Sequence, residues 1–172
     1  MQTQANLGWM GPTPIDILVT NRSGGSLAVG AVQQLDRRNA DGDSTNNTVG
    51  SENAGIANCV NIGAATTDQM VTETFGVVQR AAGDNVKTVL RLRGHCDAVS
   101  ITTNNAVLAT SRGVAVASGS SVLCVNAAQE NTGTAAALAR KVIFLPLVAG
   151  TAGGTTSGWF DGINGFGTIL FT

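Results

Sequence analysis

The residues most suited to chemistry stand in a row at His95, Cys96 and Asp97, and His95 is the only histidine of the chain. These three types could supply a base, a nucleophile and an orienting carboxylate for nucleophilic catalysis. Neighbouring residues of a strand point to opposite faces, however, so consecutive residues cannot line up as such a relay. We therefore interpret the segment as part of a strand and expect no catalytic residue and no enzyme activity.

An acidic segment is the second candidate, because Asp41 and Asp43 are followed by Glu52. These acids match the first, third and last positions of a calcium-binding loop. Asn46 stands where that loop needs glycine for its sharp turn, and no helical pattern flanks it. A solvated loop is the simpler interpretation and a looser ion site is the alternative, so we expect no metal centre.

The glycine-rich segments could in principle hold a phosphate or a nucleotide. The run 150–158 lacks the lysine and the Ser/Thr that close a P-loop. Gly162, Gly165 and Gly167 do not have the spacing of the dinucleotide-binding fingerprint. These glycines therefore indicate turns and close backbone approach, and we expect no cofactor.

The composition indicates which elements must position these residues. The chain has 172 residues, 22 of them glycine, and its charged fraction is only 12%. A disordered chain would be poorer in Val, Ile and Leu, and a coiled coil would be richer in charge. Small, β-branched and turn-forming residues instead favour many short strands joined by tight turns. We predict an all-β fold, an antiparallel β-sandwich or barrel of jelly-roll type with long loops.

Charge and hydropathy limit the partners and the compartment. Ten basic and eleven acidic residues give a net charge of −1, without the basic excess that nucleic-acid binders carry. The longest apolar run, 142–149, is too short for a membrane helix, and the N-terminus lacks the pattern of a signal peptide. Cys59, Cys96 and Cys124 have no metal-ligand spacing, which favours free thiols. We expect neither nucleic acid nor membrane as a partner, and synthesis in the cytoplasm.

An extended N-terminal arm is predicted for residues 1–14, ahead of a single β domain at 15–172. Pro12 and Pro14 exclude a helix there and favour an extended path. Trp9 lies in this arm, and aromatic anchors are enriched at protein interfaces. Packing against its own domain is an equally good interpretation of Trp9. We treat Trp9, Pro12 and Pro14 as candidate partner contacts.

The clearest strand is 86–93, in which apolar residues alternate with Lys87, Arg91 and Arg93. Such a basic stripe is usually the solvated face of an antiparallel strand, and the alternative is contact with an acidic patch on a partner. Further short segments alternate in the same way or are apolar throughout. Strands are predicted at 15–20, 26–35, 56–62, 72–79, 98–103, 113–117, 121–126, 142–148 and 166–171, with a polar loop at 36–53 and one helical turn at 135–140.

Several of these segments resemble small structural proteins of tailed phages that decorate or cement the capsid. They are Asn21–Val32, Phe75–Val78, Ala82–Asp84 and the Val- and Leu-rich residues 86–94, so the resemblance covers roughly residues 15–103. It is a pattern of strands and turns rather than of functional residues.

The resemblance implies a trimeric all-β protein on the outer surface of a phage head, where it would bridge subunits of the major capsid protein. The last predicted strand, 166–171, is apolar on both faces, which fits a subunit interface. The alternative function is another virion surface module, such as a tail or fibre adhesin or a glycan-binding domain. That module should show exposed aromatic residues, and only 4% of this chain is aromatic.

Overall fold

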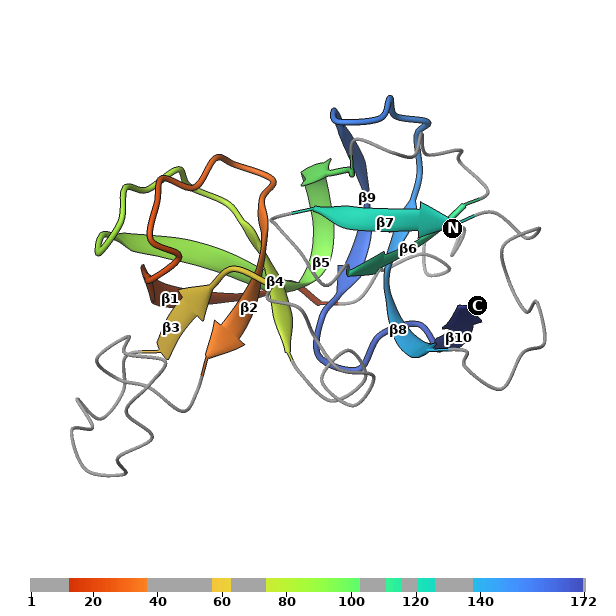
Figure 1. The fold of residues 1–172 in the computed structure, drawn as a ribbon, viewed down its shortest axis with the longest axis horizontal. Coiled ribbons are helices and arrows are strands. Elements are labelled where there is room, and N and C mark those ends of the chain that lie inside the picture. Colours follow the sequence, from red (N-terminus) through yellow and green to blue (C-terminus); the bar gives the residue numbers. More distant parts are fainter. Residues whose placement is uncertain are drawn as a thin grey trace, which may run out of the picture.

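The computed structural model describes residues 13–36, 57–62, 74–102, 111–115, 121–125 and 138–171. Within these ranges every regular element is a strand (Figure 1), which confirms the all-β prediction for this part of the chain. The strands are β1 (Ile15–Asn21), β2 (Val32–Asp36), β3 (Ala57–Val60), β4 (Phe75–Val78), β5 (Lys87–Ser100), β6 (Arg112–Ala115), β7 (Val122–Val125), β8 (Leu138–Pro146), β9 (Thr155–Asp161) and β10 (Thr168–Phe171).

The first five strands close into a ring. β3 pairs with β1 and β2, β4 joins β2 to β5, and β5 pairs back to β1. Closure removes the free sheet edges that could otherwise pair with other chains. β3 lies between β1 and β2 and pairs parallel with β1 and antiparallel with β2, so the sheet is mixed, whereas the sequence predicted antiparallel pairing.

The remaining strands continue the sheet from the far half of β5. The path runs through β9, β8, β6 and β7 and returns to the end of β5 at a bridge between Ile101 and Val122. There the Thr102 N–H also donates to the Val122 carbonyl at 3.0 Å. β10 pairs with the start of β8. β5 therefore belongs to both halves of the molecule, which form two lobes in Figure 1.

Gly94 lies within β5, where the strand passes from one lobe to the other. Its φ of +121° is a backbone conformation that other residues rarely adopt. A Cβ at this position would also lie 3.0 Å from the Pro14 Cα. The sequence predicted a separate strand at 98–103, but β5 continues past Gly94 to Ser100 because β9 pairs with this second half.

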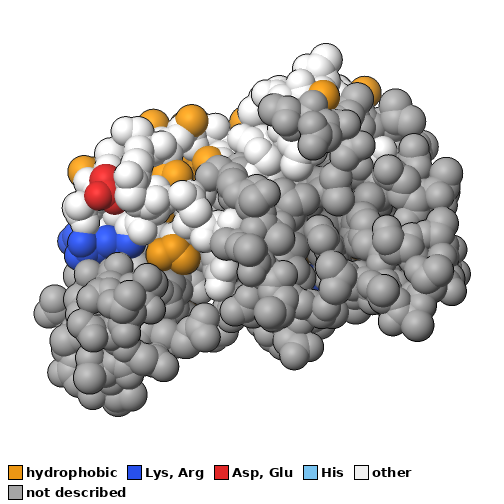
Figure 2. Space-filling model, in the orientation of Figure 1, with side chains coloured by type: hydrophobic (Ala, Val, Ile, Leu, Met, Phe, Trp, Pro, Cys, Tyr) orange, Lys and Arg blue, Asp and Glu red, His pale blue; other side chains and the backbone are white. Residues whose placement is uncertain are grey.

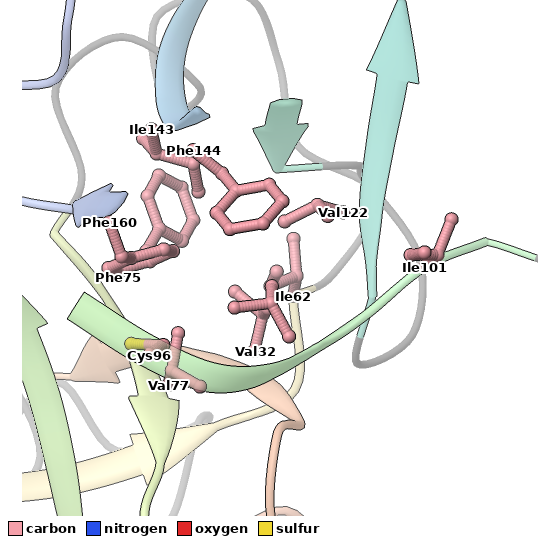
Figure 3. Packing of buried hydrophobic residues seen from close by; sticks show 11 residues of the cluster. Val32, Ile62, Phe75, Val77, Cys96, Ile101, Val122, Ile143, Phe144 and Phe160 are labelled. Carbon is pink, nitrogen blue, oxygen red and sulfur yellow. The ribbon is translucent and has the colours of Figure 1, made fainter. Parts of the chain in front are cut away.

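Two groups of buried side chains fill the two lobes. Figure 3 shows the larger group, in which Phe75, Phe144 and Phe160 gather beside β5. Burying one such ring stabilises a fold by roughly 2–3 kcal/mol. β4 is buried on both faces, because Val77 faces this group and Val78 faces the core of the first ring. The smaller group consists of Val19, Leu27, Ala31, Leu35, Cys59, Val78, Leu90 and Leu92.

Three local predictions were wrong in part. Residues 138–140 belong to β8 rather than to a helical turn, because β10 supplies a ladder of backbone hydrogen bonds. The strand predicted at 26–35 begins only at Val32, after a turn in which Gly30 has a φ of +91°. Residues 155–158 belong to β9 rather than to a loop. The loop at 36–53, apart from Asp36, and the predicted arm up to Pro12 lie outside the described residues.

Candidate functional site

The predicted contact residues that the structure describes lie along the outer face of β5. Lys87, Arg91 and Arg93 alternate with buried residues on this strand, as the sequence predicted. Pro14 is exposed and lies against Gly94 of the same strand. Trp9 and Pro12 lie outside the described residues, as do Asp41, Asp43 and Glu52.

Arg91 is held by an aspartate of the neighbouring strand. β1 pairs with β5 so that Asp16 lies opposite Arg91. The guanidinium donates Nε to Oδ1 at 2.8 Å and Nη2 to Oδ2 at 2.9 Å, a two-point geometry that fixes both groups. These bonds hold the pKa of Asp16 below its ordinary value of 3.8. The charge of Arg91 is therefore used within the fold.

Arg93 has a similar partner on the other side of β5. Asp161 of β9 lies opposite it, and Arg93 Nε donates to Asp161 Oδ2 at 3.1 Å. The other carboxylate oxygen accepts the backbone N–H groups of Ile163 and Asn164 at 3.1 and 2.9 Å. Asp161 is 7% exposed, so this pair is more enclosed than the first. Because these residues lie near Gly94, where β5 passes from one lobe to the other, we call Asp16, Arg91, Arg93 and Asp161 the bend cluster.

The row His95, Cys96 and Asp97 is divided between the two faces of β5. Cys96 is fully buried, whereas 39% of the His95 side chain and 98% of the Asp97 side chain are exposed. Burial raises the pKa of the Cys96 thiol to about 12, so it carries its proton at neutral pH. The alternation argued from the sequence is confirmed. His95 instead stacks edge-on against Trp159 of β9, with 5.3 Å between the ring centres.

A second charged surface lies at the turn between β4 and β5. Arg80 and Lys87 are both exposed, and Arg80 Nη2 donates to the Lys87 carbonyl at 3.0 Å. Arg22, from the turn after β1, donates Nη1 to Asn85 Oδ1. Asp84 is the acid among them, and its Oδ1 accepts the Gly24 N–H at 3.2 Å. We call Arg22, Arg80, Asp84, Asn85 and Lys87 the basic tip.

Asn21 holds the two turns of the basic tip together. Its side chain is fully buried, and Nδ2 donates to the carbonyls of Gly25 and Gly83 at 2.7 and 2.9 Å. Its Oδ1 accepts the Ser23 N–H at 2.9 Å, and its backbone carbonyl accepts the Asn85 N–H at 2.8 Å. One buried amide therefore fixes the position of both exposed turns.

The two surfaces differ in how their charges are balanced. The bend cluster holds two arginines and two aspartates in pairs. The basic tip holds three cations and one carboxylate, and within the described part of the chain no ion pair joins its cations to an acid. Lys141, the other cation whose side chain is described, is 5% exposed and donates to the carbonyls of Gly162 and Ile163. The described excess of accessible positive charge thus lies at the basic tip.

Exposed apolar side chains accompany the basic tip. Val86, next to Lys87, is 51% exposed, and Leu18 of β1 is 54% exposed. In Figure 2 basic and acidic side chains gather at the outer end of the first lobe, with hydrophobic side chains beside them. Hydrophobic atoms also cap the second lobe, where the turn after β8 exposes Leu147 and Val148.

Among the described residues, no group of three or more His, Cys, Asp or Glu side chains is placed to hold a metal ion. The same part of the chain contains no helix long and apolar enough to cross a membrane. Comparison of the chain with models of protein families, with curated proteins and with solved structures finds no match.

Sequence reasoning missed several residues of these surfaces. Asp16 and Asp161 are far from their arginines along the chain, and only strand register brings them together. Arg22 and Arg80 lie outside the predicted strands, where a single cation carries no pattern. A signal existed for Trp159, one of the two tryptophans of the chain, since such residues often mark surfaces that contact partners.

Proposed function

We propose that this chain is a non-enzymatic capsid cement or decoration protein. In this role it binds the outer surface of a phage head and bridges neighbouring subunits of the major capsid protein. Bridging ties capsid subunits together against internal DNA pressure and needs no chemistry. The proposal extends to a jelly-roll-like sandwich or barrel as the fold type and to a trimer as the working form.

The observation that carries the proposal is the spatial grouping of the segments that resemble decoration proteins. Asn21–Val32, Phe75–Val78 and residues 86–94 supply strands and turns of one closed ring. Asn21 is hydrogen-bonded to Gly83 in the Ala82–Asp84 segment, so the dispersed pattern corresponds to one folded unit. The grouping of these segments in one folded unit supports the proposal.

Weak contacts suffice for such a protein. A trimer that engages three equivalent sites gains avidity without new contacts at any one site. The proposed arm at 1–14 would add main-chain hydrogen bonds to the sheet edge of a neighbouring subunit. Pro14, the last residue of the proposed arm, lies against Gly94 of β5.

Co-sedimentation with expanded heads tests the proposal, with a chain lacking residues 1–14 as the second sample. We expect the full chain to pellet with expanded heads, and we expect light scattering to give the mass of a trimer. The shortened chain should fold but attach less well. A monomer that leaves expanded heads bare would contradict the proposal, and normal decoration by the shortened chain would contradict the role of the arm.

One observation favours a glycan-binding surface as the second candidate. Trp159 is half-buried on the outer face of β9 and meets His95 edge-on, so part of an aromatic ring is accessible beside polar groups. Sugars stack on such rings. A glycan-binding screen of the wild type and of Trp159→Ala separates the two candidates. A glycan-binding surface predicts a glycan that the wild type binds and the variant does not, whereas the capsid role predicts no such glycan.

A further inference from the structure

We propose that the basic tip is the surface that docks onto the partner, and that it recognises carboxylate groups on a folded protein. The inference deepens the capsid role and rests on it, since the partner would be the outer surface of the capsid. It also selects among the contacts predicted from sequence. Lys87 belongs to the docking surface, whereas Arg91 and Arg93 act within the fold.

Charge is unevenly distributed over the described part of the molecule. The whole chain has a net charge of −1, yet the basic tip carries a net charge of +2 from three cations and Asp84. Arg91 and Arg93 are engaged by Asp16 and Asp161, and Lys141 is buried. A partner rich in carboxylates therefore meets complementary charge at the basic tip rather than at the other described cations.

The basic tip is preorganised for binding. The buried Asn21 amide holds the turns at 22–25 and 82–85 in one arrangement. Arg22 and Arg80 are further oriented by Asn85 and by the Lys87 carbonyl. A surface already fixed in place loses less entropy on binding than a mobile loop does.

The side chains around the basic tip indicate the class of partner. Val86 and Leu18 add exposed apolar area next to the cations, and protein interfaces combine an apolar centre with a polar rim. Nucleic-acid binding needs more phosphate contacts than three cations can make, and an acidic chain opposes it. The combination fits an acidic protein surface better than a phosphate backbone.

The test compares two charge changes of equal size. The variant Arg80→Gln/Lys87→Gln removes two positive charges from the basic tip. The matched control, Ala149→Glu/Ala152→Glu, adds two negative charges at the exposed turn between β8 and β9. Each is measured for binding to expanded heads at low and high salt, and for retention on immobilised poly-L-glutamate and on single-stranded DNA. The single variant Lys87→Gln controls for loss of the hydrogen bond from Arg80. It removes one charge but keeps the backbone carbonyl of residue 87 that accepts this bond.

We expect the tip variant to bind heads about tenfold more weakly at low salt, a difference that shrinks at high salt, while the control binds normally. Equal binding by the tip variant and the wild type would overturn the inference, as would equal losses in the tip variant and the control. Stronger retention on DNA than on poly-L-glutamate would also overturn it.

The same experiment separates the two proposals. Decoration of heads that does not depend on the basic tip rejects the inference and leaves the capsid role standing. Retention on poly-L-glutamate that depends on the basic tip, without decoration of heads, rejects the capsid role and supports carboxylate recognition. A wild type that binds neither heads nor poly-L-glutamate rejects both.

Discussion

The bend cluster and the basic tip both include cations of β5, yet the cations of the bend cluster are paired with aspartates whereas Lys87 of the basic tip is not. Register decides the difference. Arg91 lies opposite Asp16, Arg93 lies opposite Asp161, and Lys87 lies opposite Thr20, which has no charge to offer. Cross-strand neighbours are the unit of interaction in a sheet. Whether a cation of a basic stripe is paired within the fold therefore depends on the residue opposite it on the neighbouring strand.

Asp161 is the most enclosed carboxylate of the bend cluster, and its removal should have the largest effect on stability. Asp161→Ala leaves Arg93 without its partner and two backbone N–H groups without their acceptor. We expect a loss of about 3 kcal/mol in the free energy of unfolding, measured by urea denaturation. Asp97→Ala serves as the control because Asp97 is 98% exposed and should change stability little. Equal effects of the two substitutions would contradict the structural role of Asp161.

The Asn21 side-chain amide lies beneath the basic tip, and its removal should have the next largest effect on stability. Asn21→Ala removes the buried amide that donates to the Gly25 and Gly83 carbonyls and accepts the Ser23 N–H. We expect a loss of about 2 kcal/mol in stability. Hydrogen exchange at the Ser23 and Asn85 amides should speed up more than exchange in β9. Uniform acceleration across both lobes would mean that Asn21 supports the whole fold rather than the tip.

These expectations separate what a sequence can predict from what it cannot. The alternation from Lys87 to Arg93 was readable because it depends on neighbours along the chain. The pairs Arg91–Asp16 and Arg93–Asp161 join residues 75 and 68 positions apart, so they depend on how β1 and β9 pair with β5. The continuation of β5 past Gly94 cannot be predicted from the sequence for the same reason, because it depends on pairing with β9.

Tertiary context also explains the errors in element type. The segment that ends at Arg140 has good helix formers, but its last residues pair with β10 and become strand. The start of β9 is not predicted as a strand from the sequence, because Gly158 interrupts the alternation of apolar and polar side chains. In the structure a Cβ at Gly158 would lie 2.3 Å from the Leu145 carbonyl oxygen, so close strand contact requires glycine there.

A smaller effect is expected from the exposed ion pair of the bend cluster. Asp16→Asn should cost less than about 1 kcal/mol at neutral pH, because the side chains are partly solvated. The pKa of Asp16 is lowered in the folded state, so its contribution is present above pH 3.8 and is lost as the pH falls below that value. Denaturation curves of both proteins should therefore converge in acid. A gap that persists well below pH 3.8 would assign the stabilisation to another interaction.

The smallest effect on stability is expected at the basic tip. Arg80→Gln/Lys87→Gln should leave the free energy of unfolding within about 0.5 kcal/mol of the wild type, because both side chains are exposed and form no described ion pair. Thermal melting checks this directly. A large loss would show that these cations stabilise the fold, and the contrast with the bend cluster would disappear.

The decisive measurement is attachment to expanded heads, which tests whether the chain binds the capsid through the basic tip. It is made by co-sedimentation of the wild type and the tip variant at low and high salt. We predict salt-sensitive decoration by the wild type and about tenfold weaker decoration by Arg80→Gln/Lys87→Gln at unchanged stability. Bare heads with the wild type under all salt conditions would contradict the account.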